Sequence, residues 1–157
     1  MTIAITGATG QLGQLVVNKL KEKISDDTIV ALVRSIQKAS NLDVEAREAD
    51  YDKPETLTSA LVGVDTLLLI SFRGETGRRV AQHRHVIEAA KQAGVTWIIY
   101  TSVLHADTST LGLAEDHRTT EADLNDTGIP VSLLRIGWYK ENYTGAFPNA
   151  IESGAFI

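Results

Sequence analysis

Residues 3–13 read IAITGATGQLG, a short apolar run followed at once by three glycines at intervals of three. The run Ile3–Thr6 is typical of a buried β-strand, and the helical periodicity that begins near Gly10 continues to Lys23. A glycine-rich turn between a strand and a helix is typical of loops that bind phosphate through main-chain N–H groups. This stretch therefore predicts that the chain begins with the first half of a nucleotide-binding βαβ unit.

Each glycine of this loop has an expected role. Gly7 permits the tight turn, Gly10 lets a pyrophosphate approach the backbone, and Gly13 lets the helix pack closely on the strand. The positive end of the helix dipole adds to the attraction for phosphate. A turn that needs glycine but binds nothing is the alternative. The loop residues expected to contact a dinucleotide are Gly7, Thr9, Gly10, Gln11, Leu12 and Gly13.

Strands and helices alternate along the rest of the chain. The expected strands are Ile3–Thr6, Thr28–Val33, Val44–Glu48, Thr66–Ile70, Thr96–Thr101 and Val131–Arg135. The expected helices are Gly10–Lys23, Pro54–Leu61, Arg78–Ala93 and Leu113–Asn125, with a short one near Phe147–Ser153. Continuous apolar strands between helices predict an α/β fold of the Rossmann type, a doubly wound parallel sheet with helices on both faces.

The domain organisation follows from length. The 157 residues suit one NAD(P)-binding Rossmann domain spanning residues 1–157. The apolar end GAFI (residues 154–157) is unusual for a finished chain. We therefore expect the chain to be cut before a small C-terminal lobe.

Composition excludes several classes of function. The formal net charge is −5 and no dense Lys/Arg stripe occurs, which argues against a nucleic-acid partner. With no cysteine, no His-Glu-x-x-His motif and no Gly-x-Ser-x-Gly motif, neither a metal site nor a hydrolase is predicted. No apolar run is long enough to cross a membrane, and no signal peptide is recognised at the N-terminus. A cytoplasmic location fits these features.

Arg34 decides which dinucleotide is expected. In such folds an acid after the second strand binds the ribose hydroxyls of NAD, whereas an Arg there accommodates the 2′-phosphate of NADP. The second strand ends at Val33 and Arg34 follows, with Lys38 as a second cation. NADP(H) is therefore the predicted cofactor, unless Arg34 is simply a solvated residue. Asp50, after the third strand, is the candidate for a contact near the adenine, although it could equally be a turn or cap residue.

The glycine spacing is similar to that of the extended and atypical branches of the short-chain dehydrogenase superfamily, whose usual catalytic pair is Tyr-x-x-x-Lys. No tyrosine of this chain has a lysine four positions later. On the expected helix the pair is replaced by His117 and Glu121. A quinone would suit such a site, because hydride addition yields a delocalised aryl oxide of low basicity. His117 could then donate a proton, bind the quinone oxygen, or have no role.

Motifs along the whole chain resemble those of the NmrA-like atypical short-chain dehydrogenases, and within them the bacterial quinone oxidoreductases that use NAD(P)H. The matching stretches include TGATGQLG (6–13), LLLIS (67–71), QHR (82–84), YTS (100–102), LHADTS (104–109), LLR (133–135) and GWY (137–139). The resemblance implies reduction of a small-molecule quinone to the quinol by NADPH. Besides the glycine loop, Arg34 and Asp50, it implies cofactor contacts by Ser71, Phe72, Gly74, Ser102, Gly137, Trp138, Tyr139, Asn142 and Tyr143.

Two other functions remain as alternatives. NmrA-like proteins include regulators that bind NAD(P) to sense redox state without catalysis, and the missing Tyr/Lys pair fits that reading. A sugar-nucleotide epimerase shares the loop type but needs the Tyr/Lys pair that this chain lacks. The sequence leaves open which quinone is used and whether copies of the chain associate into a homo-oligomer.

Overall fold

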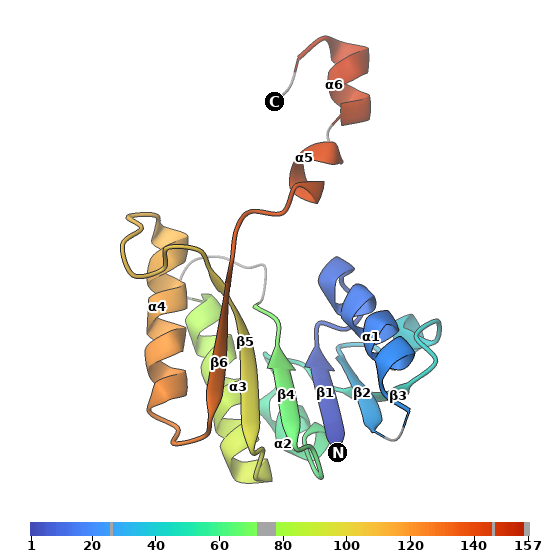
Figure 1. Ribbon diagram of the computed structural model, residues 1–157, viewed down its shortest axis with the longest axis vertical. Coiled ribbons are helices and arrows are strands. Elements are labelled where there is room, and N and C mark those ends of the chain that lie inside the picture. The colour runs from blue at the N-terminus through green and yellow to red at the C-terminus, as the bar shows by residue number, and fades with distance from the viewer. Residues whose placement is uncertain (26, 72–77, 146, 156–157) are drawn as a thin grey trace.

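The computed structural model describes residues 1–25, 27–71, 78–145 and 147–155. Its centre is a six-stranded sheet in the order β3-β2-β1-β4-β5-β6, in which every neighbouring pair is parallel (Figure 1). The strands are β1 (Thr2–Thr6), β2 (Thr28–Val33), β3 (Glu45–Glu48), β4 (Thr66–Leu69), β5 (Trp97–Val103) and β6 (Val131–Ile136). The strand order reverses between β1 and β4, the place where doubly wound folds open a crevice for a ligand.

Helices cover both faces of this sheet, as predicted. They are α1 (Gln11–Lys23), α2 (Pro54–Ala60), α3 (Arg78–Ala93), α4 (Gly112–Asn125), α5 (Glu141–Thr144) and α6 (Phe147–Ser153), with the 3₁₀ helix η1 at Ile36–Ala39. In Figure 1, α1 lies in front of the sheet while α2, α3 and α4 lie behind or beside it. An apolar core lies on each face of the sheet, in agreement with this arrangement of helices. In one core, Val17 of α1 packs with alternate residues of β1 and β2. In the other, Leu57, Val86 and Leu124 of α2, α3 and α4 pack on the opposite face.

The predicted elements are confirmed with small shifts at their ends. The helix Arg78–Ala93 and the strand Thr28–Val33 have the predicted bounds, and Gly94 ends α3 with a φ of +77°, a conformation that glycine adopts without strain. β5 is two residues longer at its carboxyl end than predicted. The short helices η1 and α5 were not predicted, because a single turn is too short to show helical periodicity.

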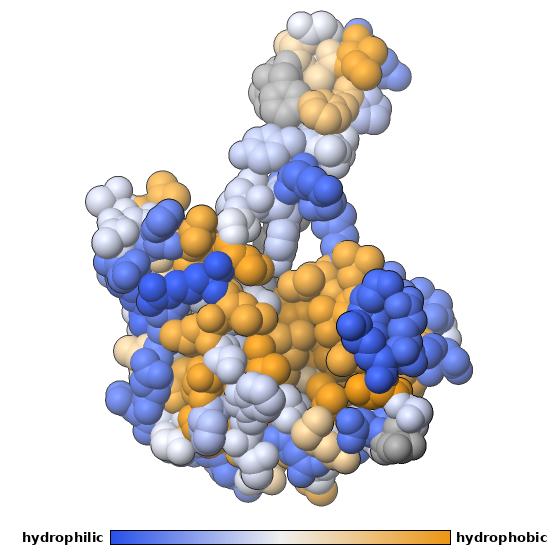
Figure 2. All heavy atoms as spheres, in the orientation of Figure 1, coloured by the Kyte–Doolittle hydropathy of each residue, from blue (hydrophilic) through white to orange (hydrophobic). Residues whose placement is uncertain are grey.

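One half of the sheet has an open apolar face. Among the described residues, α1 contacts β1 and β2 but no helix covers β5 and β6 on the same side. Trp97 and Leu134 are accordingly 43% and 46% exposed. Figure 2 shows apolar side chains gathered on this face of the molecule beside α1. Within the described residues, each helix is too short or too polar to cross a membrane.

The last residues leave the sheet. After β6 the chain runs past the carboxyl ends of the strands, and α5 and α6 stand beyond that edge (Figure 1). Phe147 and Ile151 of α6 are 48% and 82% exposed. The segment between β6 and α5 therefore lies above the edge of the sheet where ligands bind in such folds.

Candidate functional site

The glycine loop joins the carboxyl end of β1 to the N-terminus of α1. Gly7 has a φ of +58°, which permits the turn, and Gly10 N donates to Gly7 O over 2.9 Å. Gly10 is the N-cap of α1 and provides no side-chain cap hydrogen bond. The N–H groups of the first helical turn have no acceptors within a helix, so those of Gln11, Leu12 and Gly13 are donors suited to an anion.

Gly13 is required for close packing between this helix and the loop. A Cβ at Gly13 would lie 2.3 Å from Gly7 O and 2.6 Å from Ala8 Cα, both main-chain atoms. At Gly10 the nearest atom would be Gly7 O at 3.2 Å. The loop and the first turn of α1 therefore approach each other as closely as a backbone allows. This geometry agrees with the turn predicted at Gly7 and with the close packing predicted at Gly13.

A cavity of about 300 Å³ opens between the glycine loop and the ends of β2, β3 and β4. The end of the cavity beside the opening turn of α1 is lined by Gly7, Thr9 and Gly10. Apolar side chains form much of the remainder, and the residues that line it beyond the loop are Leu32, Val33, Arg34, Ala49, Asp50, Tyr51, Asp52, Ile70, Ser71 and Gln82. A cavity with the main-chain amides of a helix N-terminus at one end and apolar lining beyond them suits an adenine nucleotide.

Cations border this cavity on the side of β2. Arg34 follows β2 directly, is exposed, and also borders a second hollow of about 530 Å³ together with Thr9, Ser35 and Lys38. No acid stands at the end of β2, so the position that would accept ribose hydroxyls carries a guanidinium instead. Asp50 serves as a turn residue, since its Oδ1 accepts from Asp52 N over 3.1 Å, and it also borders the first cavity.

A further cavity of about 180 Å³ lies beyond the ends of β4, β5 and β6. Ser71 lines both this cavity and the first, so the two meet at the end of β4. Its lining includes Arg79, Ser102, Val103, Leu113, His117, Ile136, Gly137, Trp138, Tyr139 and Asn142. It therefore unites residues of α3, α4, β5 and the segment after β6. We call it the distal cavity.

His117 lines the distal cavity, and its ring nitrogen Nδ1 takes part in a hydrogen bond with a buried side chain. The hydroxyl of Tyr100, a fully buried residue of β5, lies 2.6 Å from His117 Nδ1. Burial and the nearby Arg79 lower the pKa of His117 to about 4, so its ring is neutral at neutral pH. Burial raises the pKa of Tyr100, which keeps its proton. Nε2 is then the ring nitrogen left for the cavity.

The charge beside His117 belongs to a buried ion pair. Arg79 Nη1 lies 2.7 Å from Asp116 Oδ2, and both side chains are less than a tenth exposed. One turn further into α3, His83 Nδ1 lies 3.1 Å from Thr120 Oγ1, and burial lowers the pKa of His83 to about 3. These polar contacts fix α3 against α4 and hold the His117 ring in place.

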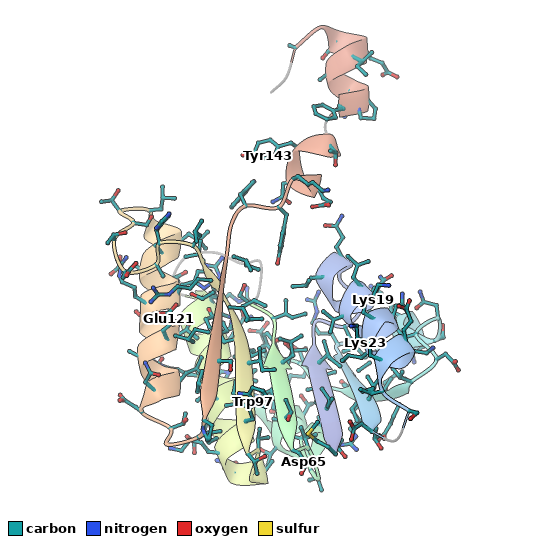
Figure 3. The ribbon with its side chains drawn as sticks, in the orientation of Figure 1. Lys19, Lys23, Asp65, Trp97, Glu121 and Tyr143 are labelled. Atoms are coloured by element: carbon teal, nitrogen blue, oxygen red, sulfur yellow. The ribbon has the colours of Figure 1, made fainter. Side chains whose placement is uncertain are left out.

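Glu121, one turn after His117, is held ionised by its partners. Burial opposes this, but the hydrogen bonds from Arg135 and Ser102 prevail and lower the pKa of Glu121. Ser102 Oγ donates to Glu121 Oε1 over 2.5 Å, and Arg135 Nη2 lies 2.7 Å from Oε2. Glu121 cannot replace the lysine of a Tyr-x-x-x-Lys pair, because it carries the opposite charge. Figure 3 shows Glu121 on α4, and Tyr143 far from it on α5.

Most of the predicted site residues meet at this edge of the sheet. Gly7, Thr9, Gly10, Arg34, Asp50 and Ser71 line the first cavity, and Ser102, His117, Gly137, Trp138, Tyr139 and Asn142 line the distal one. Gln11, Leu12 and Gly13 lie beside the first cavity in the opening turn of α1. Tyr143 is 51% exposed on α5 and lines neither cavity. Phe72 and Gly74 lie outside the described residues.

The sequence did not indicate the supporting residues. Thr6 Oγ1 accepts from Ile70 N over 2.8 Å and Thr101 Oγ1 accepts from Ser71 N over 2.8 Å, so two threonines tie the strand ends together. Tyr100, Arg79 and Gln82 were likewise not singled out. The signal was a polar residue within an otherwise apolar strand or helix face, which is too weak to identify a partner 17 or more positions away.

Three features define a dinucleotide-binding Rossmann domain. They are the glycine loop at the reversal of strand order, the close packing of α1 against that loop, and the cation after β2. In agreement, the model of the NAD(P)H-binding family matches residues 7–154. The chain belongs to this family.

Known relatives extend the comparison. The chain is 55% identical to quinone oxidoreductase 2 of Escherichia coli (strain K12), over 99% of this chain and 55% of the relative. The crystal structure of the NADPH-dependent quinone oxidoreductase from Escherichia coli complexed with NADPH superposes with a TM-score of 0.89, at 55% identity, over 97% of this chain and 54% of that one. The Citrobacter sp. triphenylmethane reductase complexed with NADP(H) gives a TM-score of 0.92 at 39% identity, over 98% and 55%. The chain thus spans about half the length of these relatives.

Proposed function

We propose that this chain is the dinucleotide-binding part of an NADPH-dependent quinone oxidoreductase. One observation carries the proposal: the first cavity and the distal cavity meet at Ser71, with phosphate-binding amides and Arg34 at one end and the neutral His117 at the other. The arrangement suits a long cofactor whose reactive ring lies next to a second ligand. The quinone oxidoreductase relatives support the choice of reaction.

The residues present fit NADPH. The approach at Gly13 leaves no room for a Cβ, and the opening amides of α1 have no side-chain cap. Arg34 and Lys38 border a hollow of about 530 Å³ next to the loop, where they would bind the 2′-phosphate. When bound, the cofactor supplies a hydride, which together with one proton from water converts a quinone to a quinol.

His117 is the proposed hydrogen-bond donor to the quinone oxygen. We assign Tyr100 O–H as the donor in its contact with His117 Nδ1, which places the proton of the neutral ring on Nε2, the atom left for the distal cavity. A neutral imidazole is a weak acid but a sufficient donor, because negative charge on a quinone oxygen is delocalised into the ring. His117 therefore polarises the oxygen, and the final proton comes from solvent.

The remaining residues of the distal cavity position and shield the reacting ring. Trp138 and Tyr139 offer planar aromatic surfaces suited to stacking on a flat substrate. The proton of Ser102 is committed to Glu121, so the Ser102 oxygen acts as an acceptor and not as a second donor to a carbonyl. Of the two, His117 and not Ser102 is therefore the donor to the quinone oxygen, and a weak donor suits a substrate that needs little acid catalysis.

The test is NADPH oxidation with a simple benzoquinone by the purified full-length protein that contains this chain, followed by the loss of absorbance of NADPH and by chromatography of the quinol. We expect protein-dependent turnover above the uncatalysed rate, with one quinol formed per NADPH. Saturable NADPH binding without any turnover would contradict the enzymatic proposal and favour the redox-sensing alternative. A different affinity for NADPH and NADP⁺ in that case would point to the sensor.

A further inference from the structure

The first cavity is bordered by a buried polar atom to which no residue in the described part of the chain donates a hydrogen bond. Gln82 lies in the second turn of α3, is 3% exposed, and lines the cavity. Its Nε2 donates to Asp52 Oδ1 over 2.9 Å, whereas no described residue donates to its Oε1. Buried amide oxygens in proteins almost always accept a hydrogen bond, so this atom is suited to a donor from a ligand in the cavity.

The orientation of the Gln82 amide is fixed by its neighbour. Asp52 also pairs with Arg78, whose Nη2 lies 2.8 Å from Oδ2, so Asp52 is an ionised carboxylate that only accepts. Turning the amide over would place its oxygen against a carboxylate oxygen. The amide nitrogen therefore faces Asp52, and the free group is an acceptor that needs an N–H or O–H donor.

A second acceptor borders the same cavity. Asp50 uses one carboxylate oxygen to accept from Asp52 N, over 3.1 Å. Leu32, Ala49 and Ile70 contribute apolar surface suited to a flat ring. A group that matches two acceptors in one partly apolar cavity is an aromatic primary amine, which carries two N–H donors.

We propose that Gln82 Oε1 and Asp50 each accept one N–H of the 6-amino group of the cofactor's adenine, and that Gln82 makes the site specific for adenine. The inference rests on the proposed function, since it places a dinucleotide in this cavity. A base with a 6-oxo group would set an oxygen against two acceptors. Such a base is therefore disfavoured at this site.

The experiment compares the binding of NADPH with that of its hypoxanthine counterpart, in which a 6-oxo group replaces the 6-amino group. For the wild-type chain we expect the hypoxanthine compound to bind about tenfold more weakly or worse. Gln82→Met keeps the size of the side chain but removes the acceptor, and the ratio of the two dissociation constants should fall about tenfold. Any loss of stability in the variant weakens both ligands equally and leaves the ratio unchanged.

Gln92→Met is the matched control, because Gln92 is an exposed glutamine of the same helix that bonds to Thr58 and Glu88. Its ratio should equal that of the wild type. Equal affinity of the wild type for both compounds would overturn the inference. So would an unchanged ratio in Gln82→Met, the result expected if a buried water satisfies Oε1. Failure to bind either compound would instead refute the proposed function and this inference with it.

Discussion

Replacing Gly13 with alanine should damage the fold and the dinucleotide site together. The new Cβ would lie 2.3 Å from Gly7 O and 2.6 Å from Ala8 Cα, whereas ordinary contacts begin near 3.4 Å. The helix must therefore move by roughly 1 Å, because both neighbours are main-chain atoms that cannot turn aside. Overpacking of this kind costs about 1–3 kcal/mol, even though alanine is favoured over glycine in a helix by about 1 kcal/mol.

The same movement displaces the amides that would hold the pyrophosphate. Losing one hydrogen bond to a charged group costs about 1.5–3 kcal/mol, which weakens NADPH binding roughly 10- to 100-fold. Urea unfolding followed by circular dichroism measures the stability, and the fluorescence of bound NADPH measures the dissociation constant. Both quantities should worsen in Gly13→Ala.

Gly112→Ala is the matched control for this prediction. Gly112 is also in the first turn of a helix, α4, but a Cβ there would have no neighbour within 4 Å. The control should be as stable as the wild type or more stable, with unchanged NADPH binding. If Gly13→Ala bound NADPH as tightly as Gly112→Ala does, the close approach of helix and loop would not be what shapes the site.

Three further predictions concern the charged and titrating residues. Arg34→Ala should weaken NADPH binding roughly 10- to 100-fold and change NADH binding little. The control Arg84→Ala removes an arginine that is paired with Asp123 and should alter neither dissociation constant. Equal losses of affinity for both dinucleotides would show that Arg34 does not bind the 2′-phosphate. In ¹⁵N-histidine NMR spectra, His117 should carry its proton on Nε2, and Tyr100→Phe should mix the two tautomers; a proton on Nδ1 in the wild type would contradict the assigned donor. The unfolding free energy should fall as the pH drops from 7 to 5, by about 1–2 kcal/mol for each of His83 and His117. Their folded-state pKa values, about 3 and about 4, lie below the ordinary 6.5. The unfolded chain therefore binds more protons than the folded chain over this pH range. His83→Gln should reduce this pH dependence and the exposed His105→Asn should not; a stability that stays constant over this range would contradict the buried neutral histidines.

The fold was predictable because each local pattern agrees with the global topology. The continuous apolar stretches of β1, β2 and β4 can only be buried on both sides, and α3 shows its helical face over sixteen residues. The parallel, doubly wound sheet followed from the alternation of strands and helices and from right-handed crossovers, whereas the strand order was not predicted. The short helices η1 and α5 were missed, since single turns are fixed by their surroundings and not by periodicity.

The candidate site was predictable only where chemistry requires a residue at a fixed place along the chain. Gly13 and Arg34 are such residues, because the loop and the end of the second strand have fixed positions in this fold. The pairs Arg79–Asp116 and Tyr100–His117 were not predictable. They depend on how α3 and α4 lie against β5, which a single sequence does not specify residue by residue. Tyr143 was predicted with its neighbours in the segment after β6, but α5 carries it away from both cavities.

Binding of a pyrophosphate by the glycine loop is tested most directly by a titration of the purified chain with NADPH and, separately, with NADH. We expect a saturable signal at one site per chain, with NADPH bound more tightly than NADH because of Arg34. Absence of saturation with either compound up to millimolar concentration would contradict the claim that the amides beside Gly7, Gly10 and Gly13 bind a pyrophosphate.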